Sequence, residues 1–306
     1  MTAKRHAATE IVDAVVIGTG AGGGPLAARL AQAGLSVVAL EAGRAFRPDD
    51  HVADEVAADI YWMEERLSGG ATPTAFGSNN SGMGIGGSTL HWGAFCPRPD
   101  PRDLHLATLT GERVDWPVGH AELVRYIEEV ERFTGVSGPA SHPWDAGRHY
   151  AYPPVARNAA ADAMARGCAA IGIAAADAPA ALVSRDRDQP YWGRRQACVN
   201  CGTCHQGCRT AAKTSMDTTY LPFAVAHGAE IRAGARMLSF EFDGSGRINA
   251  VVYRQDGEDH RQRCSTVFLC AGCSTSASPT RAVRWGATSW RTSRRSYGAG
   301  STPICG

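Results

Sequence analysis

The fold is set by residues 11–41, which read IVDAVVIGTGAGGGPLAARLAQAGLSVVALE. Ile11–Ile17 is a continuous apolar run, a pattern typical of a parallel strand buried on both faces. A helix is predicted over Gly22–Ala33, because its leucines recur on one face and Gly34 follows as a helix-ending residue. Ser36–Glu41 has the composition of a second buried strand. Strand, helix and strand within about 30 residues form a βαβ unit, so the sequence predicts an α/β fold with a parallel sheet.

The turn between the first strand and the helix has the pattern G-x-G-x-x-G, at Gly18, Gly20 and Gly23. A position directly after a strand and opening a helix is the context in which this pattern indicates a dinucleotide site. Gly18 would make the tight turn, Gly20 would let the backbone approach a pyrophosphate, and Gly23 would let the helix pack closely on the strand. The helix N-terminus adds free N–H groups and partial positive charge. The alternative is a glycine-rich turn that binds no ligand.

An acidic residue, Glu41, ends the second predicted strand. A carboxylate at that position can accept both hydroxyls of a ribose, and it would repel a 2′-phosphate. The sequence therefore favours FAD or NAD over NADP. The alternative is an exposed carboxylate at the end of a strand.

A second glycine-rich segment, GMGIGGSTLHWG at residues 82–93, lies about 65 residues after the first glycine of the turn. It would allow a second close backbone approach to an extended ligand, which nicotinamide enzymes rarely need. This favours FAD over NAD. Ordinary turn hydrogen bonding is the alternative for the hydroxyls of Ser88 and Thr89.

These motifs together resemble the N-terminal part of the glucose–methanol–choline (GMC) family of FAD-dependent oxidoreductases. The similarity extends over most of residues 10–272. It is carried by Asp13–Gly23, Glu41-Ala-Gly43, Gly86–Trp92, Tyr220-Leu-Pro222, Gly228–Ile231 and Val267–Gly272.

The resemblance implies that FAD lies along the first βαβ unit, with the glycine–serine segment near its pyrophosphate and flavin. It also implies hydride transfer from the CH–OH carbon of a small alcohol, sugar or sterol-like donor to flavin N5, while a base takes the hydroxyl proton. The cofactor-binding residues implied in this way are Gly18, Gly20, Gly23, Glu41, Gly87, Ser88, Thr89 and His91.

His91 has a separate precedent in the same family. Pyranose oxidases attach flavin covalently through a histidine in a Ser-Thr-His-Trp stretch, whereas here Leu90 intervenes between Thr89 and His91. We therefore expect a histidine near the flavin without a covalent bond. A histidine packed in a polar loop is the alternative.

Four cysteines, Cys198, Cys201, Cys204 and Cys208, follow the spacing of a bacterial ferredoxin run, with Arg209 in place of its proline. They predict one iron–sulfur cluster, which would carry electrons from reduced flavin to an acceptor protein. Zinc is less favoured, because it usually takes two separated Cys-x2-Cys pairs, and a disulfide is disfavoured in a reducing compartment. A reduced loop without a metal is the alternative.

The predicted organisation is discontinuous. A Rossmann-like FAD-binding domain with a β-meander is expected at residues 10–120 and 209–272, and an inserted, incomplete α+β substrate or cap region with the cysteine loop at 121–208. Helices are predicted over 121–133, 159–171 and 218–227, and strands over 237–242, 248–253, 260–264 and 267–270.

Residues 273–306 differ in character from the rest. From Ser274 onward there are five arginines, no acidic residue and no leucine. The net charge of +1 is therefore the sum of −4 for residues 1–273 and +5 for the tail. We interpret the tail as a frameshift product or a broken gene, with a disordered basic tail as the alternative. The family's catalytic base is then expected beyond the end of this chain, and we expect weak or no turnover from the chain as it stands.

Composition excludes several classes of protein. No apolar run approaches the roughly 20 residues of a membrane span, and the first ten residues lack the core of a signal peptide, so we expect a cytoplasmic protein. A net charge of +1 gives no reason to expect nucleic-acid binding. The rival functions are an NAD-dependent dehydrogenase and a non-enzymatic iron–sulfur electron-transfer module.

Overall fold

The computed structural model describes residues 4–54, 56–61, 82–112, 114–141 and 147–270. These residues form two compact units. The first comprises the described residues of 1–47, 54–91 and 215–306, and the second those of 48–53 and 92–214. The second unit thus begins at Trp92, before residue 120, because the chain after Trp92 pairs with residues near 180: Cys96 N–H donates to the Pro179 carbonyl at 3.0 Å. The tail at 273–306 lies outside the described residues.

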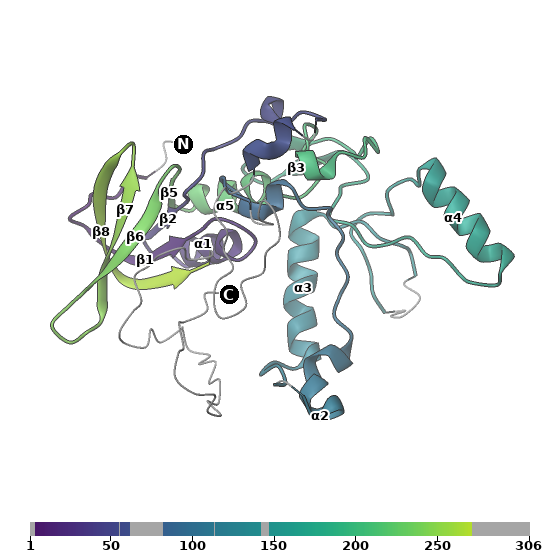
Figure 1. The fold of residues 1–306 in the computed structure, drawn as a ribbon, viewed down its shortest axis with the longest axis horizontal. Coiled ribbons are helices and arrows are strands. Elements are labelled where there is room, and N and C mark those ends of the chain that lie inside the picture. Colours follow the sequence, from purple (N-terminus) through teal and green to yellow (C-terminus); the bar gives the residue numbers. More distant parts are fainter. Residues whose placement is uncertain (1–3, 55, 62–81, 113, 142–146, 271–306) are drawn as a thin grey trace. The chain divides into compact units, whose positions relative to one another are not determined.

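The first unit contains a six-stranded mixed sheet of order β5-β2-β1-β8-β7-β6 (Figure 1). Strands β5, β2, β1 and β8 run parallel to one another, and β8, β7 and β6 form an antiparallel meander. This is the α/β, Rossmann-like architecture that the sequence predicts. The strands are β1 (Ile11–Ile17), β2 (Val37–Leu40), β5 (Glu230–Arg232), β6 (Arg236–Phe242), β7 (Ile248–Gln255) and β8 (Glu258–Leu269).

The last strand corrects the prediction of two separate strands at 260–264 and 267–270. β8 is one twelve-residue strand. Its first half pairs antiparallel with β7, its second half pairs parallel with β1, and Arg263 pairs with residues of both. The exposed Ser265 and Thr266 interrupt the apolar pattern, but Thr266 stays in register with Ala14, so the ladder continues through them.

Helix α1 (Gly23–Gln32) packs on this sheet through small residues. Its buried stripe runs through Ala27, Ala28 and Ala31, whereas the leucines that predicted the apolar face are only half-buried. Gly23 shows why the approach must be close: a Cβ there would lie 1.9 Å from the Gly18 carbonyl oxygen. Helix α5 and the short 3-10 helices of the first unit complete its elements: α5 (Tyr220–Ala226), Ala57–Tyr61, Gly87–Leu90 and Met216–Thr218.

The second unit combines helices and one small hairpin with long irregular segments. Among its described residues no helix or strand joins the six-stranded sheet. Its elements are α2 (Leu106–Thr110), α3 (His120–Thr134), α4 (Ala159–Ala170), β3 (Arg187–Gln189), β4 (Gly193–Arg195) and the 3-10 helices Pro48–Asp50, Pro101–His105 and Cys204–Gln206.

A fully buried guanidinium, that of Arg195, links the parts of the second unit. It donates to the carbonyl of Thr134 at the end of α3 at 2.6 Å, and to those of Ala211 and Ala212 at 2.8 and 3.0 Å. The C-terminus of a helix has a partial negative charge, which favours a cation at that position. Arg195 therefore joins α3, the hairpin and the segment after the cysteine loop.

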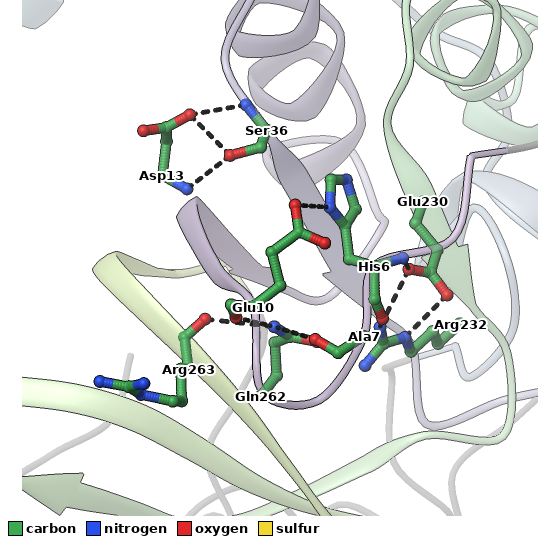
Figure 2. Close-up of polar contacts among 9 residues, drawn as sticks. All are labelled: His6, Ala7, Glu10, Asp13, Ser36, Glu230, Arg232, Gln262 and Arg263. Atoms are coloured by element: carbon green, nitrogen blue, oxygen red, sulfur yellow. Dashed lines mark hydrogen bonds and ion pairs between the residues drawn. The ribbon is translucent and has the colours of Figure 1, made fainter.

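The N-terminal segment is attached to the edge strand β5 by a polar cluster (Figure 2). Glu230 accepts hydrogen bonds from the His6 backbone N–H at 2.7 Å and from the Arg232 guanidinium at 2.9 and 3.0 Å. Arg232 also donates to the His6 carbonyl at 2.9 Å. The side chains of Arg232 and Glu230 are 10% and 13% exposed, so the loss of one partner would leave a nearly buried charge.

We predict that Glu230→Ala lowers the free energy of unfolding by about 3 kcal/mol, because it removes the carboxylate that pairs with the nearly buried Arg232 and accepts from the His6 N–H. The control is Glu241→Ala in β6, the opposite edge strand, where Glu241 pairs with Arg261 at 39% and 44% exposure. That change should cost less than about 1 kcal/mol. Urea unfolding followed by circular dichroism measures the free energy of unfolding of both variants. Equal losses of stability would contradict the role given to the Glu230–Arg232 pair.

Candidate functional site

The first glycine turn joins the end of β1 to the start of α1. Gly18 has φ +89° and its N–H donates to the Leu40 carbonyl at 2.8 Å, which turns the chain out of the sheet. No side chain caps the N-terminus of α1, and no acidic residue lies in its first turn. The first turn of the helix therefore keeps N–H groups and positive potential for an anionic ligand.

The second glycine segment, defined here as residues 82–90, lies directly on this turn. Gly87 has φ +55°, and a Cβ at that position would lie 2.8 Å from the Gly20 Cα. Only glycine adopts this backbone conformation without strain when another segment of the backbone lies so close. The two glycine segments thus lie against each other, with no side chain between Gly20 and Gly87.

Glu41 lies at the centre of these segments and is only 6% exposed. Its carboxylate accepts hydrogen bonds from the Thr19 N–H at 3.0 Å and hydroxyl at 2.8 Å, and from the N–H groups of Gly43 and Gly84 at 3.1 and 3.3 Å. The sequence left open that Glu41 is an exposed carboxylate at the end of a strand. The structure instead buries it. Thr19 is a site residue that sequence reasoning missed. The feature of the sequence that could have indicated it is a hydroxyl side chain between Gly18 and Gly20.

The hydroxyl residues of the second glycine segment have different surroundings. Thr89 is buried, donates to the Gly86 carbonyl at 2.6 Å and accepts from the Met216 N–H at 3.0 Å, so it anchors the segment to the region before α5. Ser88 is exposed and accepts from the Gly82 N–H at 3.0 Å. His91 is 5% exposed, and a Cβ on Gly82 would lie 2.4 Å from its Nε2, so its ring packs against that glycine.

The four cysteines of the predicted cluster lie in one loop of the second unit, at residues 198–208. Each of three cysteines has a polar partner two residues further along the chain. In the parts of the chain that the structure describes, no three His, Cys, Asp or Glu side chains are placed to hold a metal. The iron–sulfur prediction therefore finds no support. The thiol contacts are Cys198 with Asn200 at 3.9 Å, Cys201 with Thr203 at 3.2 Å and Cys208 with Thr210 at 3.5 Å.

The thiols also differ in acidity. Burial raises the pKa of Cys198 and of Cys204, whereas the hydrogen bond with Thr203 lowers the pKa of Cys201. All eight cysteines in the described ranges are outside disulfides. The loop is supported instead by Lys213, which is 1% exposed and donates from Nζ to the Cys204 carbonyl at 2.6 Å and from its backbone N–H to the Cys208 thiol at 3.3 Å.

Comparison with known proteins agrees with the motifs. The model of a family described as GMC oxidoreductase matches residues 63–280. The chain is 32% identical over 280 residues to 6'''-hydroxyparomomycin C oxidase of Streptomyces lividus, a match that covers 88% of this chain and 50% of the relative. It is 26% identical over 250 residues to cholesterol oxidase of Mycobacterium tuberculosis, covering 75% of this chain and 40% of the relative. The chain thus spans about half the length of the curated relatives it matches.

A solved structure shows the same fold. The crystal structure of pyridoxine 4-oxidase from Mesorbium loti superposes with a TM-score of 0.55 at 19% identity, over 85% of this chain and 49% of that one.

Across the described ranges, the helices are all too short or too polar to cross a membrane.

We predict a pH dependence of stability from His51, which is 7% exposed and packs against Gly207. Burial, aided by the Lys213 ammonium, lowers the pKa of His51 from 6.5 to about 4. Because folding favours the neutral ring, His51 contributes its full stability above about pH 6.5, and this is lost as the pH falls through about 4. About 3 kcal/mol should be lost as the pH falls from about 6.5 to about 4, because each pKa unit corresponds to about 1.4 kcal/mol.

Urea unfolding at several pH values tests this prediction. The variant His51→Gln should lose the part of the pH slope that belongs to His51, whereas His149→Gln, at an exposed position, should keep it. The same slope in wild type and His51→Gln would show that the burial of His51 is not responsible.

Proposed function

This chain belongs to the GMC oxidoreductase family, and from that premise we propose that it binds FAD on its two glycine segments and serves the oxidation of a small CH–OH donor. The observation that carries the proposal is the backbone contact between Gly20 and Gly87. A single glycine turn is common to NAD and FAD proteins, whereas a second one laid against it suits a longer ligand with two points of close approach.

The roles of the residues follow from their positions. Gly18, Gly20 and Gly23 would admit the pyrophosphate to the start of α1, and Gly87 would let the second glycine segment lie against that turn beside the ligand. Ser88 and His91 would lie along the ligand toward the flavin. When bound, FAD supplies the redox chemistry by accepting a hydride at N5 from the substrate carbon.

The substrate class is proposed from the relatives. Those named above are oxidases of an aminoglycoside and of a sterol, and further matches include a 2-methyl-1,2-propanediol dehydrogenase and long-chain-alcohol oxidases. An alcohol, sugar or sterol hydroxyl is common to these names. An electron acceptor, either a small molecule or a protein, would have to reoxidise the flavin.

We predict that the purified chain binds FAD and that Gly87→Ala raises the dissociation constant at least about tenfold, because alanine disfavours φ +55° and its Cβ would press on Gly20. The control is Gly22→Ala in the first turn. Gly22 has helical φ and ψ, and its Cβ would have only an ordinary contact with Cys270 at 3.9 Å, so affinity should change less than about threefold.

Isothermal titration and the visible absorption of bound flavin measure this. Binding of NAD but not FAD by the wild type would contradict the proposal. Anaerobic addition of alcohols, sugars and sterols tests the oxidation separately, because a donor that reacts bleaches the flavin band. Binding without bleaching by any of these donors would contradict only the proposed substrate class.

A further inference from the structure

We propose that Thr19 and Glu41 form a positioning pair that holds the second glycine segment on the first glycine turn before any dinucleotide binds. The function of the pair rests on the proposed FAD site. Its contacts, however, all lie within the first unit and join groups of the protein itself.

The carboxylate of Glu41 is fully used within the protein. A carboxylate offers about four lone-pair sites, and four donors occupy them here. Two donors come from Thr19 in the first turn, one from Gly43 just after β2, and one from Gly84 in the second glycine segment. Hydrogen bonds to an ionised group are the stronger kind, so a nearly buried charge is stabilised by three separate parts of the chain.

Thr19 extends this contact to a second point of the same segment. Its side-chain hydroxyl donates to Glu41 at 2.8 Å and accepts from the Gly86 N–H at 3.1 Å, and the residue is fully buried. Glu41 therefore reaches the second glycine segment twice: directly at Gly84, and through the hydroxyl of Thr19 at Gly86. Without the pair, both N–H groups would lose their acceptors inside the protein.

The direction of the carboxylate is set by the sheet. The Glu41 N–H donates to the Arg232 carbonyl at 2.9 Å, and the Glu41 carbonyl accepts from the Ala235 N–H at 2.7 Å. Strand β5 and the residues that follow it thus fix the Glu41 backbone. A side chain with a fixed backbone and four hydrogen bonds on its oxygens is a rigid support for the second glycine segment.

Preorganisation is the consequence for binding. Gly87 follows Gly86 directly and makes the close approach to Gly20, so the pair holds the two glycine backbones at this separation. A segment that is already ordered does not have to be ordered when the ligand binds, and this raises the affinity. Ribose hydroxyls that reach Glu41 would share its lone pairs with these amides, so that contact also depends on the pair.

The test uses the full chain freed of flavin, with residue-resolved amide hydrogen exchange. Thr19→Val keeps the shape and removes the hydroxyl, and Thr19→Ser keeps the hydroxyl and removes the methyl. We expect Thr19→Val to speed exchange at Gly86 about tenfold or more and to weaken FAD binding by a similar factor. Thr19→Ser should stay near wild type. The Gly18 amide, bonded to Leu40 within the sheet, should remain protected in both variants.

Glu41→Gln provides a second route if Thr19→Val does not fold, because its amide group would face N–H donors and should release Gly84. Unchanged exchange at Gly84 and Gly86 in the folded variants would overturn the proposal, even if FAD bound more weakly. Faster exchange in a chain whose wild type binds no FAD would support the positioning pair and reject the proposed function.

Discussion

Strand β1 lies between two parallel partners from distant parts of the chain, and the first unit depends on this pairing. β2 follows within the same βαβ unit, whereas β8 arrives only after the whole second unit has been inserted. The ladder continues past the strand, since the Cys270 N–H donates to the Ile17 carbonyl at 2.8 Å. The glycine turn is therefore held at the carboxyl end of a central strand, the edge at which open α/β sheets bind their ligands.

Long polar side chains hold the irregular segments around this sheet. Glu41, Arg195 and Lys213 are all nearly or fully buried, and most of their hydrogen-bond partners are main-chain groups of other segments. Loops have few helix or sheet hydrogen bonds of their own, so their buried N–H and C=O groups need such partners. In both units the segments that carry the motifs are fixed in this way, by one buried side chain that contacts several backbones.

Most regular elements of the first unit could be predicted because their signals are local. Neighbouring residues alone predict the strand at Ile11–Ile17, the glycine turn and the following helix, because their apolar residues and glycines recur in a regular pattern. Strand β5 has only three residues and no periodicity, so its pairing with β2 could not be read. The same holds for the bonds from Glu41 to Gly84 and from Thr19 to Gly86, because they join residues far apart in sequence and depend on how the sheet places them.

The cysteine loop shows how one spacing can be read in two ways. Cysteines three residues apart match a cluster-binding run when the loop wraps a metal, because the thiolates must then converge. Here Asn200, Thr203 and Thr210 each lie two residues after a cysteine, which is the spacing of a local side-chain turn. Each of these three thiols therefore has a local polar partner, which the cysteine spacing alone does not reveal.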